Sequence, residues 1–200
     1  MKFQFCFLLV YAMTGIQCSA QVFYPDLCNP NFNDVCYSIE CLDRALESTQ
    51  CLILENMHRP KLPKEMKQCV QLKQIMIIEC GYGELPEEIY SCPNLTYLNF
   101  CSDTPNRITN QISMCKNLIG INFANCRLSK LPNSIRKLEK LEFVILVANR
   151  FNKIPHAMYT LKSLKYLDIG CNPIPEKEIE KFRRIRPDVE LIFEPIPNLN

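Results

Sequence analysis

One spacing constrains the fold of this chain more than any other feature, because apolar residues recur in it every 23 positions. Each copy carries three linked apolar positions, with the second three residues after the first and the third two residues later. These are Leu72, Leu95, Leu118, Leu141 and Leu164, then Ile75, Leu98, Ile121, Val144 and Leu167, then Ile77, Phe100, Phe123, Leu146 and Ile169. The alternation at the end of each copy predicts a short strand.

The second half of each unit also repeats. An apolar residue and a proline share one register, at Leu62-Pro63, Leu85-Pro86, Leu131-Pro132 and Ile154-Pro155. Proline followed by apolar residues at three-residue spacing favours an irregular or 3₁₀ return segment. A single unit has too little core to fold alone, so we expect the units to stack, with their strands forming one parallel sheet.

The unit from Leu141 to Leu161 also has an asparagine, Asn149, at a fixed place after the strand. With its Leu-Pro return segments, the pattern resembles the leucine-rich-repeat family of the roughly 23-residue type. The flanking stretches Ser38–Leu46 and 172–182 resemble the ends of bacterial secreted members. The resemblance implies an α/β solenoid: a curved stack with a parallel concave sheet, a mostly irregular or 3₁₀ convex side, a short N-terminal cap helix and a C-terminal helix.

The N-terminal residues have the pattern of a signal peptide. Lys2 precedes an apolar run over Phe3–Ala12, and Cys18-Ser19-Ala20 places small residues before the expected cleavage after Ala20. A membrane anchor is the alternative, but the run is shorter than the ~20 residues of a span. Lipidation of Cys18 is a second alternative, although the preceding residues match that motif poorly. We therefore expect an exported mature chain with no integral membrane segment.

The remaining chain divides into three parts. Residues 21–48 are expected to form an N-terminal cap with a helix over Ser38–Leu46, and residues 49–182 about six repeats. Residues 183–200 are expected to form the C-terminal cap and tail. A helix is predicted over Glu176–Arg184 and a last edge strand over Val189–Phe193. These caps would cover the open ends of the stack.

The chain has 13 cysteines, of which 11 remain after the expected cleavage. Three of them occupy apolar slots in adjacent repeats, which predicts reduced thiols that act as small core residues; they are Cys69, Cys92 and Cys115. Four more surround the N-terminal cap, where one disulfide is expected: Cys28, Cys36, Cys41 and Cys51. A zinc site is the alternative, but the chain has no C-x-x-C spacing.

Charge and motif content argue against several classes of function. The 23 basic and 21 acidic residues give a net charge of +2, too little to attract nucleic acid. Both histidines, His58 and His156, are isolated in return segments, and the sequence has no glycine-rich phosphate loop. We therefore predict a protein that is not an enzyme and has neither a cofactor nor a metal site.

Function is then expected on the surface of the sheet. Strand residues between the ladder positions face away from the core, and several are apolar or aromatic. We predict a concave-face site for a protein or peptide, formed by Tyr97, Phe143, Ile145, Val147, Tyr166 and Asp168. The alternative for the same pattern is the ordinary preference of strands for such residues. Alternative functions are a structural or adhesive surface role and thiol-based redox or metal chemistry; the oligomeric state is not predicted.

Overall fold

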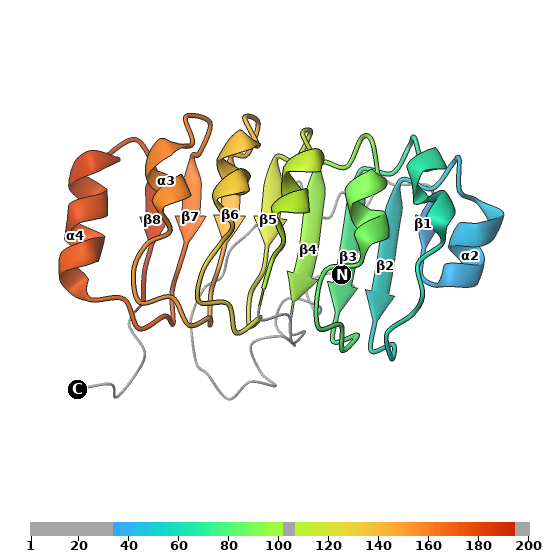
Figure 1. The fold of residues 1–200 in the computed structure, drawn as a ribbon, viewed down its shortest axis with the longest axis horizontal. Coiled ribbons are helices and arrows are strands. Elements are labelled where there is room, and N and C mark those ends of the chain that lie inside the picture. Colours follow the sequence, from blue (N-terminus) through green and yellow to red (C-terminus); the bar gives the residue numbers. More distant parts are fainter. Residues whose placement is uncertain (1–33, 102–106, 195–200) are drawn as a thin grey trace, which may run out of the picture.

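The computed structural model of the chain describes residues 34–101 and 107–194. Within these ranges the strands form one sheet in chain order, β1 to β8, and every neighbouring pair is parallel (Figure 1). This confirms the predicted parallel pairing. The strands are β1 (Val35–Cys36), β2 (Cys51–Glu55), β3 (Gln74–Ile78), β4 (Tyr97–Cys101), β5 (Gly120–Asn122), β6 (Phe143–Ile145), β7 (Tyr166–Asp168) and β8 (Glu190–Ile192). The predicted signal peptide and residues 21–33 of the predicted cap lie outside the described residues.

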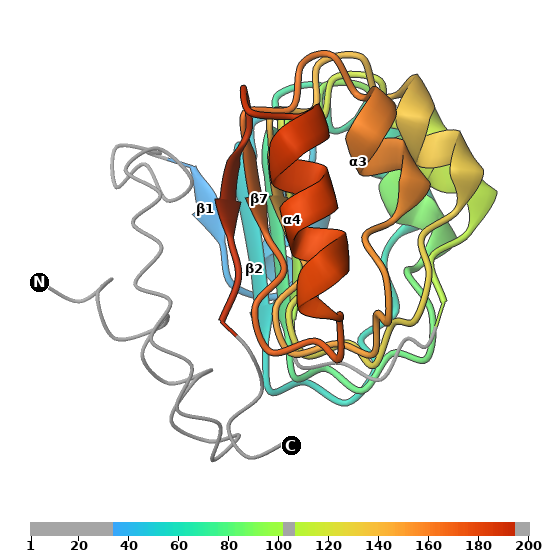
Figure 2. The ribbon, with the colours of Figure 1, turned by 90° about the vertical axis from the view of Figure 1, so that its left-hand side faces the viewer.

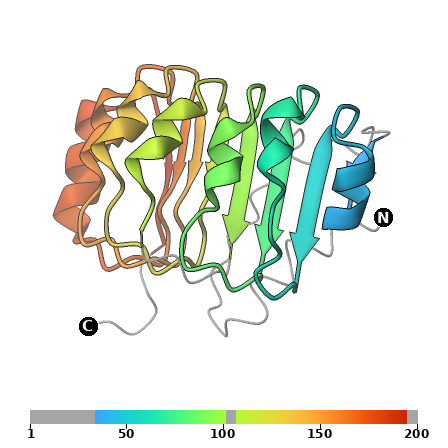
Figure 3. The ribbon, with the colours of Figure 1, turned by 45° about the vertical axis from the view of Figure 1, so that its right-hand side comes forward.

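Short helical turns run back along the opposite face of the stack (Figure 3). Four are 3₁₀ helices and one is a single α-helical turn, as the proline-containing return segments predict. They are η1 (Lys64–Gln68), η2 (Glu87–Ser91), η3 (Asn110–Met114), η4 (Asn133–Lys137) and α3 (His156–Thr160). Proline stands directly before four of the five, because its fixed φ suits the start of a helical turn and its missing N–H costs nothing there.

The core lies between the sheet and the return segments. The predicted ladder residues are in register from strand to strand, as in the run Ile75, Leu98, Ile121, Val144 and Leu167. These side chains are at most 3% exposed and belong to one continuous cluster. Each fully buried Leu or Ile contributes about 1.5–3 kcal/mol of transfer free energy. The residues that recur every 23 positions are therefore in register from strand to strand, and together they form the core.

A second ladder of inward-facing polar residues satisfies backbone groups in the turns after several strands, at Cys80, Cys126, Asn149 and Asn172. The carboxamide of Asn149 accepts hydrogen bonds from the backbone N–H groups of Cys126 (3.1 Å) and Leu128 (2.9 Å). Its Nδ2 donates to Phe123 O at 2.7 Å and to Leu146 O at 2.9 Å. Where the ladder has Cys126 instead, the thiol lies 2.9 Å from Phe100 O. Small inward-facing polar groups therefore connect consecutive repeats through their backbones.

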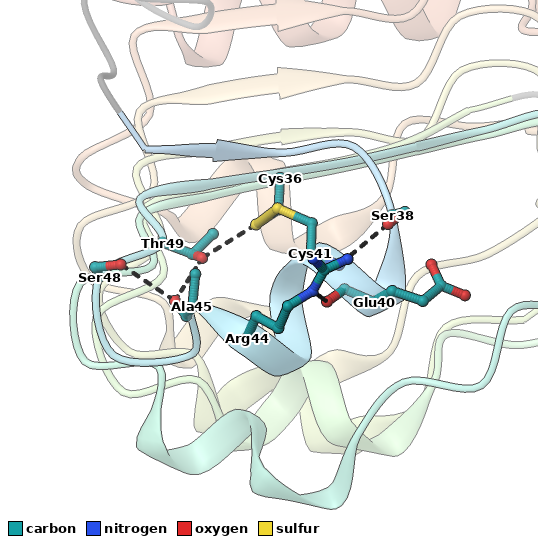
Figure 4. The surroundings of a disulfide bond; sticks show 8 residues. All are labelled: Cys36, Ser38, Glu40, Cys41, Arg44, Ala45, Ser48 and Thr49. Carbon is teal, nitrogen blue, oxygen red and sulfur yellow. Dashed lines mark hydrogen bonds between the residues drawn. A yellow bond between two sulfur atoms is a disulfide. The ribbon is translucent and has the colours of Figure 1, made fainter.

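A helix and a disulfide close the N-terminal end. Helix α2 (Ile39–Arg44) begins where Ser38 Oγ accepts the N–H of Cys41 at 3.1 Å, which confirms the predicted helix and its N-cap. Cys36 and Cys41 form a disulfide next to Thr49 (Figure 4). This confirms the expectation of one bridge in the cap.

Helix α4 (Glu176–Ile185) covers the other end of the stack (Figure 2). It buries Ile179 and Phe182 completely, and the chain then returns to the sheet as β8 beside β7. Both the predicted helix and the predicted last strand are confirmed. Each end of the stack thus has a helix over part of its core.

Candidate functional site

The concave face of the sheet is formed by strand positions that alternate with the core ladder. In one row of neighbouring positions, Tyr97 pairs with Gly120, Gly120 with Phe143, Phe143 with Tyr166 and Tyr166 with Glu190. Neighbouring strands lie about 4.8 Å apart, so adjacent side chains in such a row can touch. We call this row the aromatic row.

Three of the six predicted site residues belong to the aromatic row and keep part of their surface. Tyr97, Phe143 and Tyr166 are each half-buried. Phe143 and Tyr166 are direct neighbours on β6 and β7, while Gly120 separates Tyr97 from them. The structure therefore brings the predicted aromatic residues together along one edge of the concave face, where the strands begin.

The prediction that Ile145 and Val147 are exposed is wrong. Ile145 is 3% exposed and Val147 is 1% exposed. They form a second apolar cluster, separate from the main core, with three small side chains from other strands and turns: Cys101, Ala124 and Cys171. Tyr166 packs against this cluster. Ile145 lies two residues after Phe143 on β6, so it faces the same side of the sheet, beside the aromatic row. Because Ile145 and Val147 are buried in this cluster, they pack next to Tyr166 and are not themselves a contact surface.

Asp168 is also buried, contrary to expectation, with no exposed surface. Its Oδ1 accepts the backbone N–H of Gly170 at 3.1 Å, whereas its Oδ2 has no hydrogen-bond partner. The pKa of Asp168 is raised from 3.8 to about 6, mainly because burial disfavours the charged form; the Gly170 hydrogen bond opposes this rise, and the nearby Glu194 carboxylate adds to it. Asn122 occupies the position in register with Asp168 two strands away, and its Oδ1 accepts the backbone N–H of Ala124 at 3.0 Å in the same way. Asp168 is therefore a buried acid two residues along β7 from Tyr166, on the same face of the sheet.

The prediction omitted several polar residues of this face. Cys101 lies with its thiol 2.7 Å from Asn99 Oδ1, and Glu190 extends the aromatic row onto β8 with an exposed side chain. Glu190 follows Tyr166 by 24 residues, one more than the period, and this insertion hid its place in the row. The terminal strand alternates only weakly, so the sequence offered no other signal.

Three thiols of the core are buried in an apolar environment, at Cys69, Cys92 and Cys115. Burial raises the pKa of the Cys69 thiol to about 11 and that of Cys115 to about 12, and it raises the pKa of Cys92 as well. Such thiols are not nucleophilic at neutral pH, because the thiolate is the reactive form. His156 begins α3, where its ring lies 6.5 Å from that of Tyr159 between centroids. Among residues 34–101 and 107–194, no three metal-binding side chains gather in one place.

Comparison with solved structures places this geometry among known folds. A leucine-rich-repeat protein of Leptospira interrogans matches with a TM-score of 0.61, at 28% identity over 74% of this chain. The chain has the leucine-rich-repeat fold. An internalin of Listeria monocytogenes matches with a TM-score of 0.53, at 12% identity over 82% of the chain, and internalin C2 of that species with 0.59, at 17% identity over 80%.

These leucine-rich-repeat neighbours are longer proteins, of which the chain spans 38%, 55% and 66% respectively. No protein-family model matches the sequence. No curated protein sequence matches it significantly either. In the part of the leucine-rich-repeat chain that the structure describes, no helix is long and apolar enough to cross a membrane.

Proposed function

We propose that this chain is a non-enzymatic protein-interaction module whose partner, a protein or peptide, lies across the concave face and contacts the aromatic row. The observation that carries the proposal is the placement of Phe143 and Tyr166, which are neighbours in register on a sheet face and retain accessible surface. Aromatic side chains dominate the energy of many protein interfaces, since they bury a large area for little loss of conformational entropy.

The packing around the row supports the same proposal. Tyr166 rests on the cluster that contains Ile145 and Val147, so its ring is held in one place before a partner arrives. A side chain that is already ordered loses less entropy on binding, and more of its contact energy is realised as affinity. Tyr97, beyond Gly120, provides a further aromatic contact for a partner that crosses several strands.

The chemistry of the described residues supports the proposal of a non-enzymatic role. The core thiols have raised pKa values. Within residues 34–101 and 107–194, Asp168 is the one carboxylate with a strongly raised pKa, and the hydrogen bond found for its side chain comes from the backbone of Gly170. This disfavours the thiol-based alternative more than the structural or adhesive one. Binding requires no such chemistry, only a shaped surface.

We also propose that the module acts after export, with the signal peptide removed after Ala20. The support is the sequence pattern of residues 1–20. Sequencing the N-terminus of the protein recovered outside the cytoplasm tests this. A mature chain that begins at Gln21 is expected, and a chain retained in the cytoplasm with its N-terminus intact would contradict it.

Site-specific crosslinking tests the binding proposal. A photoreactive amino acid is placed at Phe143 in one variant and at Lys137, an exposed residue of the return segments, in a matched control. After irradiation in the native compartment, we expect one discrete crosslinked protein from the Phe143 variant and none from the control. Crosslinks from Lys137 alone would place the partner on the convex side and refute the proposal.

A further inference from the structure

The charges on the concave face have a single sign in the described part of the chain. The strand positions that face away from the core, together with the residues that continue them, include four acidic side chains and no Lys, Arg or His. The acidic residues are Glu55, Asp168, Glu190 and Glu194. Three of these four lie at the β7–β8 end of the sheet, so the negative charge is concentrated beside Tyr166.

The nearest lysine is engaged elsewhere. Lys165 precedes Tyr166, but its Nζ lies 2.8 Å from Glu142 Oε2, on the side of β6. None of the ion pairs found in the described ranges includes Glu190, which is exposed. The buried Asp168, next to β8 in the sheet, has an oxygen without a hydrogen-bond partner. Glu190 therefore brings to the β8 end of the aromatic row a negative charge that no ion pair among the described side chains neutralises.

Two aromatic rings followed by a carboxylate along neighbouring strands favour the binding of a cationic group. Phe143, Tyr166 and Glu190 are consecutive in register on β6, β7 and β8, so one extended group can contact two rings and then the carboxylate. The face of an aromatic ring attracts ammonium and guanidinium groups, and a guanidinium can stack on a ring while it donates hydrogen bonds to a carboxylate. A negative surface also repels an acidic partner.

We propose that Phe143, Tyr166 and Glu190 form a subsite for a lysine or arginine side chain, and that the partner on the concave face is a basic protein segment. The inference rests on the proposed function and specifies the chemistry of the partner. Phe143 and Tyr166 contact the aliphatic stem and the cationic group, and Glu190 pairs with its charge. Asp168 and Glu194 add negative potential further along the same strands.

Three synthetic fluorescent peptides of equal length test the subsite against the purified mature chain. They share a Gly-Ser backbone and carry arginine, glutamate or leucine at alternate positions. By fluorescence anisotropy at low salt, we expect the arginine peptide to bind at least about tenfold more tightly than the glutamate peptide. Its affinity should fall as the salt concentration rises to about 0.3 M, because salt screens exposed charges.

Two variants and a control locate the binding. Glu190→Gln and Tyr166→Leu should each lower the affinity for the arginine peptide by about tenfold, which corresponds to about 1.4 kcal/mol of binding free energy. Leucine at position 166 keeps the packing against the second cluster, and a urea unfolding curve verifies that the variant is folded. Glu139→Gln removes an exposed carboxylate in the turn that precedes β6 and should leave affinity unchanged.

Several results would overturn the inference. Equal binding of the arginine and glutamate peptides, or an unchanged affinity in Glu190→Gln, would exclude a cationic subsite. Binding of the leucine peptide alone, lost in Phe143→Ala, would leave the proposed function intact and refute only the cationic partner. Binding of none of the three peptides would refute the subsite, whereas the crosslinking experiment would still decide the proposed function separately.

Discussion

Arg186 holds Asp188 in a two-point ion pair, with Nε 2.9 Å from Oδ1 and Nη2 2.8 Å from Oδ2. Arg186 as a whole is 9% exposed. The ion pair fixes its guanidinium, which also reaches the last return segment. There Nη1 donates to the carbonyls of Met158 at 2.9 Å and Leu161 at 3.0 Å. Arg186 therefore satisfies backbone groups of the last return segment and ties them to the C-terminal cap.

Replacing Arg186 with methionine should destabilise the chain by about 2–4 kcal/mol, because buried carbonyls lose charge-assisted hydrogen bonds that water replaces poorly. The urea midpoint measures the loss. Arg183→Met is the matched control, since Arg183 pairs with Glu176 at an exposed site and such pairs contribute little. Equal midpoint shifts for the two variants would refute a special role of Arg186 in closing the stack.

Asn149→Ala should cost at least about 3 kcal/mol of unfolding free energy. The substitution leaves buried backbone groups of two repeats without partners, and each such group costs about 1–3 kcal/mol. The exposed Asn133 in η4 provides a control in Asn133→Ala, which should cost less than about 0.5 kcal/mol. If both asparagines prove equally dispensable in chemical denaturation, the polar ladder is not a source of stability.

The raised pKa of the buried Asp168 should make the stability of the chain depend on pH. This pKa is raised from 3.8 to about 6 in the folded chain, so folding favours the protonated acid. The stabilisation is fully present below about pH 4 and is lost as the pH rises through about 6, by on the order of 3 kcal/mol. Asp168→Asn removes this dependence. The difference in unfolding free energy between wild type and variant, measured between about pH 4 and 7, should therefore change across this window; a constant difference would contradict the buried acid.

The core thiols Cys69, Cys92 and Cys115 should resist alkylation in the native chain. All three are at most 2% exposed, and burial raises the pKa of each. Mass spectrometry after iodoacetamide treatment should find them unmodified until denaturant is added, when all three react. Detection of any of them in a disulfide, or its rapid native alkylation, would show that these ladder positions open or are misassigned.

The apolar period predicted most of the fold because ladder residues satisfy a requirement that repeats in every unit. Ile75 and Leu98 must face the same core, so their spacing reveals both strand and register. The period carries no such signal for the backbone turn after each strand. Glu79, Asn125 and Ala148 all adopt φ 54°, a left-handed conformation, although none is glycine. The hydrogen bonds between repeats impose this conformation, and residue type alone does not indicate it.

The candidate site was predicted only in part for a related reason. Alternation in a strand assigns each side chain to a face, and it placed Phe143 and Tyr166 correctly on the face opposite the core. It does not reveal how closely neighbours on that face pack. Ile145 and Val147 are buried in a cluster with Cys101, Ala124 and Cys171, which come from three different repeats. Exposure on a sheet face is a property of several strands together.

The most direct measurement of the central claim is partner affinity in a double variant of the aromatic row. Once the crosslinked partner is identified, Phe143→Ala with Tyr166→Ala should weaken its binding by at least about 2 kcal/mol, which is about thirtyfold. The rings are half-buried, so a moderate loss of stability is expected, and binding is measured where urea curves show the variant folded. Lys137→Ala with Lys162→Ala, on exposed positions outside the strands, should bind normally. Normal binding by the aromatic variant and weakened binding by the lysine variant would contradict the account and move the site off the concave face.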